Sequence, residues 1–159
     1  MQAWLDGVSE SRLGLAMRDG LWLYPLVEVV HIIGFALLVG AVFLFDLRVL
    51  GLSKNIPVTA LARHLLPWAF GSLLLIVPAG LMMFSSAPHD FVGNQVFILK
   101  LCLIAVAGVN AGLFHLGPYR SVSRWNTGVA APGVARIQAA LSMMLWVCVV
   151  VCGRLLAYT

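Results

Sequence analysis

The chain has 159 residues, of which 62% are hydrophobic and 10% are charged, and its formal net charge at pH 7 is +4. A soluble domain is typically about 45–50% apolar and about 25% charged, so this composition excludes an ordinary soluble protein and indicates an integral membrane protein. The basic residues mostly flank apolar segments, as orientation signals do, so the positive charge does not indicate nucleic-acid binding.

The N-terminal segment, residues 1–20, is expected to form a short amphipathic helix that lies at the membrane surface. It carries three acidic residues, Asp6, Glu10 and Asp19, and it lacks the cationic start and the apolar core of a cleavable signal peptide. Its apolar positions suit a helix that buries one face at the membrane interface.

Residues 21–159 are expected to form one domain with four transmembrane helices, at about 21–45, 65–84, 95–116 and 135–157. Each apolar segment reaches the length of about 20 residues that crosses a hydrocarbon core of about 30 Å. The predicted fold is therefore all-α, a four-transmembrane-helix bundle with a short N-terminal interfacial helix. Its first partner is the lipid bilayer.

Basic residues predict the orientation of this bundle. The first and third connecting segments share a surplus of them, with the residues Arg48, Lys54, Arg63, Arg120, Arg124 and, just beyond, Arg136. Lys and Arg mark the cytoplasmic side of a membrane. The sequence thus predicts a multi-pass protein of the bacterial inner (cytoplasmic) membrane with both termini external.

His31 lies inside the first apolar segment, and Glu28, one helical turn earlier, is its ionisable companion there. An imidazole at membrane depth is costly unless something compensates it, so such a histidine is by default a candidate functional residue. The compensation could be a hydrogen bond, a proton-transfer partner, a copper ion or a haem iron. The function depends on which of these His31 has.

Depth along the helices groups the other polar candidates. With a rise of about 1.5 Å per residue, Lys100 falls in the same outer half of the membrane as His31, and Arg154 falls at its rim. His64 and His115 lie near the opposite surface, and His115 is more than about 15 Å from His31 in depth. One iron shared by His31 and His115 is therefore not expected, whereas a second haem site between His64 and His115 is geometrically possible.

Small and polar residues indicate how the helices pack. Gly108 and Gly112 form a GxxxG pattern, which favours close packing within the bundle or in a homo-oligomer. Asn110 and Ser142 fall at matching depths, so they could hydrogen-bond across the third and fourth membrane segments.

Three parts of the sequence resemble known membrane proteins. The segment from Glu28 to Gly40, with Asp46-Leu-Arg48 at its exit, resembles the first helix of HemJ-type protoporphyrinogen oxidases and also helices of CopD-type copper-resistance proteins. The segment around Lys100 resembles a later HemJ-type helix that carries an essential lysine. Most of the chain is similar to an uncharacterised bacterial family of short four-helix membrane proteins, through Leu65–Trp68, Asn110–His115 and Gly153–Tyr158.

The HemJ-type resemblance implies that His31 is an axial ligand of haem b and that Lys100 pairs with carboxylates of the haem or of a porphyrin. The sequence therefore favours a haem b-binding protein with an electron-transfer or membrane redox role, working with a quinone or another redox partner. Whether it is an oxidoreductase in its own right stays open. Candidates for the second axial ligand are His89, Met82, Met83 or a water molecule.

Two alternatives stay open. The first is copper handling of the CopD type, for which soft ligands are available, namely Cys148, Cys152, Met143, Met144, Met82 and His31. The second is a structural or accessory membrane subunit without a cofactor, in which Glu28 and His31 form a satisfied hydrogen-bonded pair.

Overall fold

The computed structural model describes residues 2–158, so residues 1 and 159, the outer bounds of the two expected segments, lie outside the described part. Within it all regular secondary structure is helical, with α1 (Gln2–Ser9), α2 (Arg12–Asp19), α3 (Leu23–Leu50), α4 (Val58–Ser86), α5 (Pro88–Gly93), α6 (Gln95–Leu116), a 3-10 helix η1 (Pro118–Arg124) and α7 (Gly133–Leu155). The predicted all-α fold is confirmed.

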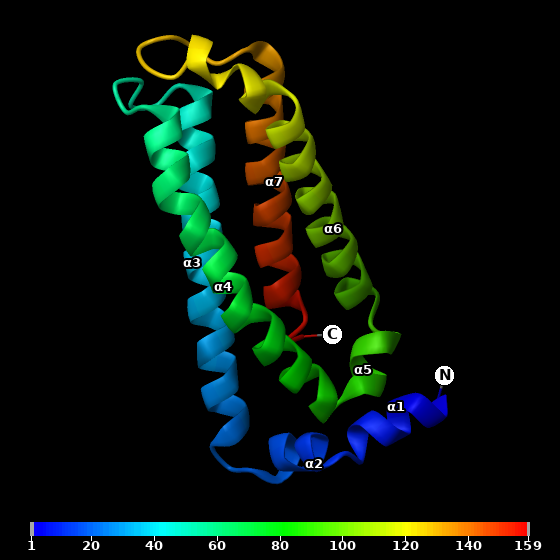
Figure 1. Ribbon diagram of the computed structural model, residues 1–159. Helices are drawn as coiled ribbons and strands as arrows, with labels where there is room; N and C mark the ends of the chain where they lie inside the picture. Colours follow the sequence, from blue (N-terminus) through cyan, green and yellow to red (C-terminus); the bar gives the residue numbers. More distant parts are fainter. Residues whose placement is uncertain (1, 159) are drawn as a thin grey trace.

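Four of these helices, α3, α4, α6 and α7, are long and apolar enough to cross a membrane. The shortest, α6, has 22 residues, which span about 33 Å at the α-helical rise. The chain is thus a multi-pass membrane protein. In the bundle α3 lies beside α4 and α6 lies beside α7, while α3 and α7 join the two pairs (Figure 1).

The two ends of the bundle differ, and we name them by their elements. At the η1 end lie the α3–α4 connection and the α6–α7 connection, which contains η1 (Figure 1). At the α1 end lie α1, α2 and α5, where α2 packs against α3 and α4 through the buried side chains of Met17, Val27 and Ala79.

The N-terminal segment forms two short helices instead of the single helix that was expected. The break lies at Ser11, whose extended backbone (φ −60°, ψ 154°) begins α2 and whose side chain accepts a hydrogen bond from the amide of Gly14. Serine is among the residues preferred at this capping position. The hydrophobic pattern did not reveal the break because both helices keep an apolar face.

Two membrane helices extend beyond their expected bounds. Helix α3 continues to Leu50 instead of ending near residue 45, and it ends where Gly51 adopts a left-handed conformation (φ 117°) that favours glycine. Helix α4 begins at Val58 instead of residue 65, directly after Pro57. Apolar length measures the part of a helix that crosses the hydrocarbon, whereas these helices continue past it.

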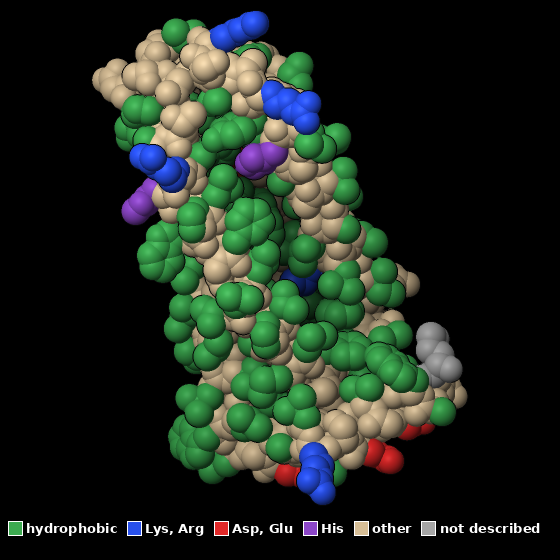
Figure 2. All heavy atoms as spheres, viewed as in Figure 1, with side chains coloured by type: hydrophobic (Ala, Val, Ile, Leu, Met, Phe, Trp, Pro, Cys, Tyr) green, Lys and Arg blue, Asp and Glu red, His purple; other side chains and the backbone are tan. Residues whose placement is uncertain are grey.

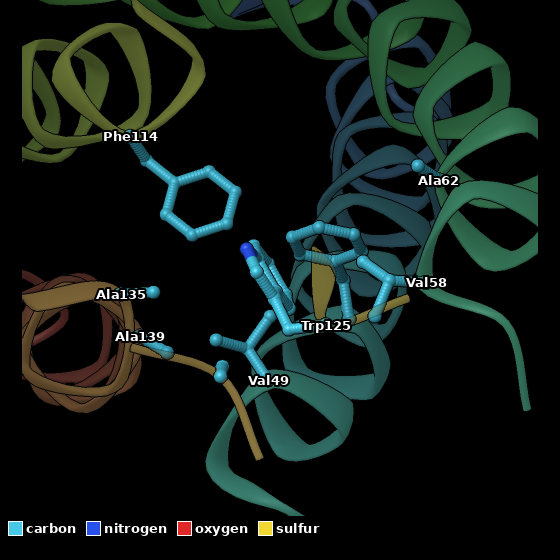
Figure 3. Close-up of a cluster of buried hydrophobic side chains, with 9 residues drawn as sticks. Val49, Val58, Ala62, Phe114, Trp125, Ala135 and Ala139 are labelled. Carbon is cyan, nitrogen blue, oxygen red and sulfur yellow. The ribbon is translucent and has the colours of Figure 1, made fainter. Parts of the chain in front are cut away.

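The largest buried apolar cluster lies at the η1 end. Figure 3 shows Trp125 among side chains from the membrane helices, with Phe114 of α6 and Ala135 and Ala139 of α7 on one side and Val58 and Ala62 of α4 on the other. Trp125 is 2% exposed, so the segment after η1 folds into the bundle and fixes its helices at this end.

Glycines allow close contact between α3 and α4. A Cβ added to Gly34 would lie 3.0 Å from the side chains of Leu75 and Ile76, so a larger residue would force these neighbours to move by a few tenths of an ångström. In contrast, a Cβ on Gly108 or Gly112 would meet nothing within 4 Å. The GxxxG pattern of α6 is therefore not used within the bundle.

Candidate functional site

The ring of His31 hydrogen-bonds to the neighbouring helix α4. Its Nδ1 lies 3.0 Å from the main-chain oxygen of Ile76. Because a carbonyl can only accept, Nδ1 carries the hydrogen, and in the neutral ring Nε2 keeps its lone pair. The acceptor is thus a main-chain carbonyl of α4, and not the Glu28 carboxylate that the alternative of an accessory subunit pairs with His31.

Gly80 of α4 leaves room for this ring. A Cβ at position 80 would lie 3.3 Å from Cε1 and 3.6 Å from Nδ1 of His31. The imidazole therefore lies directly against the backbone of α4, one turn beyond Ile76. Pro78 lies inside the same stretch of α4, where a proline removes one main-chain hydrogen bond of the helix.

His31 belongs to a face of α3 that points towards α7. The spacing of Glu28, His31, Phe35 and Asp46 places them on one side of the helix. Phe35 contacts Trp146 of α7 with ring centroids 6.1 Å apart. Asp46 hydrogen-bonds to the side chain of Ser142, which also belongs to α7. The face with His31 is thus the inner face of the α3–α4 pair.

Lys100 approaches this face from the opposite helix pair. It is the only Lys or Arg in α6, and its Nζ lies 3.7 Å from the position of a Cβ added to Gly153 of α7. Lys100 and Glu28 are the two charged side chains that act on His31 electrostatically. Figure 2 shows the molecule hollowed between α4 and α6, with a basic side chain recessed in the hollow.

Arg154 is engaged elsewhere. Its guanidinium donates a hydrogen bond to the hydroxyl of Tyr158 and lies 4.9 Å from the centre of that ring. Its side chain is exposed at the end of α7. Arg154 is thus held at the rim by a neighbour on its own chain segment, whereas Lys100 and Glu28 lie within electrostatic range of His31.

The other three histidines lie apart from His31. His89 of α5 pairs with Asp6 of α1, with 2.8 Å between Nε2 and Oδ1. His64 is exposed on α4. His115 lines a cavity beside Leu65, which lies roughly 16 Å along α4 from Ile76, the partner of His31.

The sulfur-containing residues are distributed over different surroundings. Met82 and Met83 pack against the cluster of Met17, Val27 and Ala79 at the α1 end. Cys102 and Cys148 are exposed and Cys152 is buried. Over residues 2–158, no three His, Cys, Asp or Glu side chains are grouped closely enough to hold a metal ion among them.

Sequence reasoning missed the most deeply buried acid of the chain. Asp46 is 6% exposed and lines the same cavity as His115, although in the sequence it looks like the start of a polar connection. The available signal was its spacing from His31 and Phe35, which continues one helix face. The hydrogen bond expected between Asn110 and Ser142 is replaced by another one across the same two helices. The Asn110 amide donates to the main-chain oxygen of Gln138.

The comparisons with known proteins give a family without an assigned activity. No curated protein and no solved structure matches the chain. Residues 13–159, which include all four membrane helices, match DUF6644, a family of unknown function. The chain belongs to this family.

Proposed function

We propose that the chain binds haem b through His31 and takes part in electron transfer within the membrane. The observation that carries the proposal is the hydrogen bond from Nδ1 of His31 to the main-chain oxygen of Ile76. Histidines that ligate metals usually donate their other ring N–H to a carbonyl or carboxylate, which fixes the tautomer and raises the basicity of the ligating nitrogen. Nε2 is the ligating atom in this proposal.

The neighbouring residues suit such a group. Gly80 makes room at the ring, and Lys100 supplies a positive charge on the facing helix pair for a propionate. Haem b, when bound, would supply one-electron chemistry through its ferric and ferrous states. His31 would hold the iron, Lys100 would orient the carboxylates, and the apolar helices would exclude water.

The resemblance to HemJ-type proteins points to the same two residues, His31 and Lys100, by a separate route. Copper handling stays the second candidate function, and the two cysteines of α7 that it would use differ in exposure. Soft ligands that converge would be expected around Cu(I).

The test is the visible spectrum of the detergent-purified protein and of histidine variants. The wild-type protein is expected to show a Soret band that sharpens and shifts upon reduction with dithionite. His31→Ala should lose the haem and still insert, because apolar helices satisfy their own backbone in lipid. His64→Ala and His115→Ala should retain most of it.

A glycine pair provides a matched control on α4. Gly80→Val places a branched side chain against the His31 ring and should weaken haem binding, whereas Gly71→Val adds the same side chain where nothing lies within 4 Å of the added Cβ. A colourless wild-type protein would contradict the proposal. So would a His31→Ala protein with full haem content.

A further inference from the structure

A second polar region lies inside the bundle, in the half nearer the η1 end. A cavity of about 90 Å³, open on one side, is lined by residues from α3, α4, α6 and α7. Most of its lining is apolar, and the polar residues that line it are Asp46, Asn110, His115, Gln138 and Ser142. This region is separate from His31, because the Phe35–Trp146 contact lies between the two along α3.

Asp46 brings a carboxyl group into this cavity without a basic partner. Its Oδ2 has no hydrogen-bond partner, and Ser142 is the side chain that hydrogen-bonds to the carboxyl group. Arg48, two residues away, is occupied by the main-chain oxygens of Ile56, Lys54 and Asn126. A buried carboxylate is costly unless an opposite charge compensates it.

The other polar groups of the cavity also accept hydrogen bonds. Oε1 of Gln138 is buried without a partner, and the Asn110 amide already donates to the main-chain oxygen of Gln138. Nδ1 of His115 lies 2.9 Å from the oxygen of Ala111, so it carries the hydrogen and leaves Nε2 as an acceptor. The two oxygens without a partner, Asp46 Oδ2 and Gln138 Oε1, therefore lack a donor or a cation that faces them.

We propose that the cavity binds a sodium ion, with Asp46 Oδ2 and Gln138 Oε1 as its protein ligands. Carboxylate and amide oxygens are hard ligands, which suit a hard cation. One carboxylate balances one positive charge, whereas a divalent ion would remain under-compensated and normally takes several carboxylates. Since a water molecule occupies about 30 Å³ of liquid, the cavity also has room for water in the remaining coordination positions.

The decisive measurement is the thermal unfolding of the full chain in detergent, in sodium, potassium or choline chloride at equal ionic strength. Sodium should raise Tm saturably, by about 3–6 °C over choline at a concentration tenfold above Kd. Potassium should give a smaller rise. The same Tm in sodium and choline would overturn the proposal, and equal rises in sodium and potassium would overturn the assignment to sodium.

Variants locate the site. Asp46→Asn should abolish the sodium response, whereas Asp19→Asn, which changes an exposed carboxylate at the end of α2, should leave it intact. Gln138→Leu keeps the carboxylate and should weaken the response even if Asp46→Asn does not fold. A sodium response that survives both cavity variants would overturn the proposal.

An infrared measurement separates sodium from a bound proton. A protonated carboxylic-acid band in saturating sodium that Asp46→Asn removes would identify a proton site and would also overturn the proposal. These outcomes do not depend on haem at His31, because they are measured on the apoprotein as well as on any coloured fraction.

Discussion

His31 and Asp46 lie on the same face of α3, but they differ in whether their polar atoms have hydrogen-bond partners. His31 donates to a main-chain oxygen of α4, so its ring is oriented before any ligand arrives. Asp46 presents an oxygen that no side chain or main-chain group satisfies. Native proteins leave few such groups, and each one needs a physical explanation. The oriented ring of His31 suits a metal ligand, and the unpartnered oxygen of Asp46 suits a bound cation.

Lys100 provides the electrostatic prediction at this scale. If haem binds at His31 as proposed, Lys100→Met should lower its midpoint potential, because removing a positive charge favours the ferric form. An interaction of about 1–2 kcal/mol, as expected at an effective dielectric constant of about 20, corresponds to about 40–90 mV for one electron. A redox titration followed at the Soret band measures the shift.

Arg154→Met is the control for that titration. Arg154 is exposed and already pairs with Tyr158, so its removal should change the potential much less. Equal potentials in the wild-type and Lys100→Met proteins would show that Lys100 has no role in binding haem carboxylates.

At the scale of elements, Arg48 connects segments that are far apart in the sequence. It was expected in the first connecting segment, but it lies in the last turn of α3 and is 3% exposed. Its guanidinium donates to the oxygens of Lys54 and Ile56 in the α3–α4 connection and of Asn126 after η1. One side chain thus holds both connections of the η1 end together.

Replacing Arg48 should therefore destabilise the bundle. Arg48→Ala leaves three main-chain oxygens without their donor, and hydrogen bonds to a charged group contribute about 1.5–3 kcal/mol each. We expect a loss of at least about 2–3 kcal/mol in the free energy of unfolding, measured as a fall in Tm in detergent. Arg63→Ala, which removes an exposed arginine at the same end, should have little effect, and equal Tm values for the two variants would contradict this role.

At the scale of the whole molecule, apolar length was enough to predict the number of membrane helices and the fold class. The helix ends at Leu50 and Val58 were not predicted, since they depend on Gly51, Pro57 and the contacts of Arg48. The partner of His31 was not predictable either, because a main-chain oxygen 45 residues away has no sequence signature. Asp46 was missed because its burial results from the packing of four helices.

The distribution of charge over the whole molecule supports the last prediction, which concerns orientation. Figure 2 shows basic side chains towards the η1 end, and at the α1 end acidic side chains with a basic one among them. Arg48 is buried, so the exposed basic residues at the η1 end are Lys54, Arg63, Arg120, Arg124 and Arg136. At the α1 end, the guanidinium of Arg18 donates hydrogen bonds to the hydroxyl and the main-chain oxygen of Ser9. The same N-terminal segment carries the acidic residues Asp6, Glu10 and Asp19.

Because Lys and Arg are retained on the cytoplasmic side, this asymmetry predicts a cytoplasmic η1 end and external termini. Reporter fusions after residue 54 and after residue 127 should then show cytoplasmic activity, and a fusion at the C-terminus should show external activity. Replacing Lys54 and Arg63 by glutamine should weaken the preference, since the positive charge near the first two membrane helices is the main determinant of orientation. A cytoplasmic C-terminus would contradict the prediction, and it would place the cavity that holds Asp46 nearer the external surface and His31 nearer the cytoplasm.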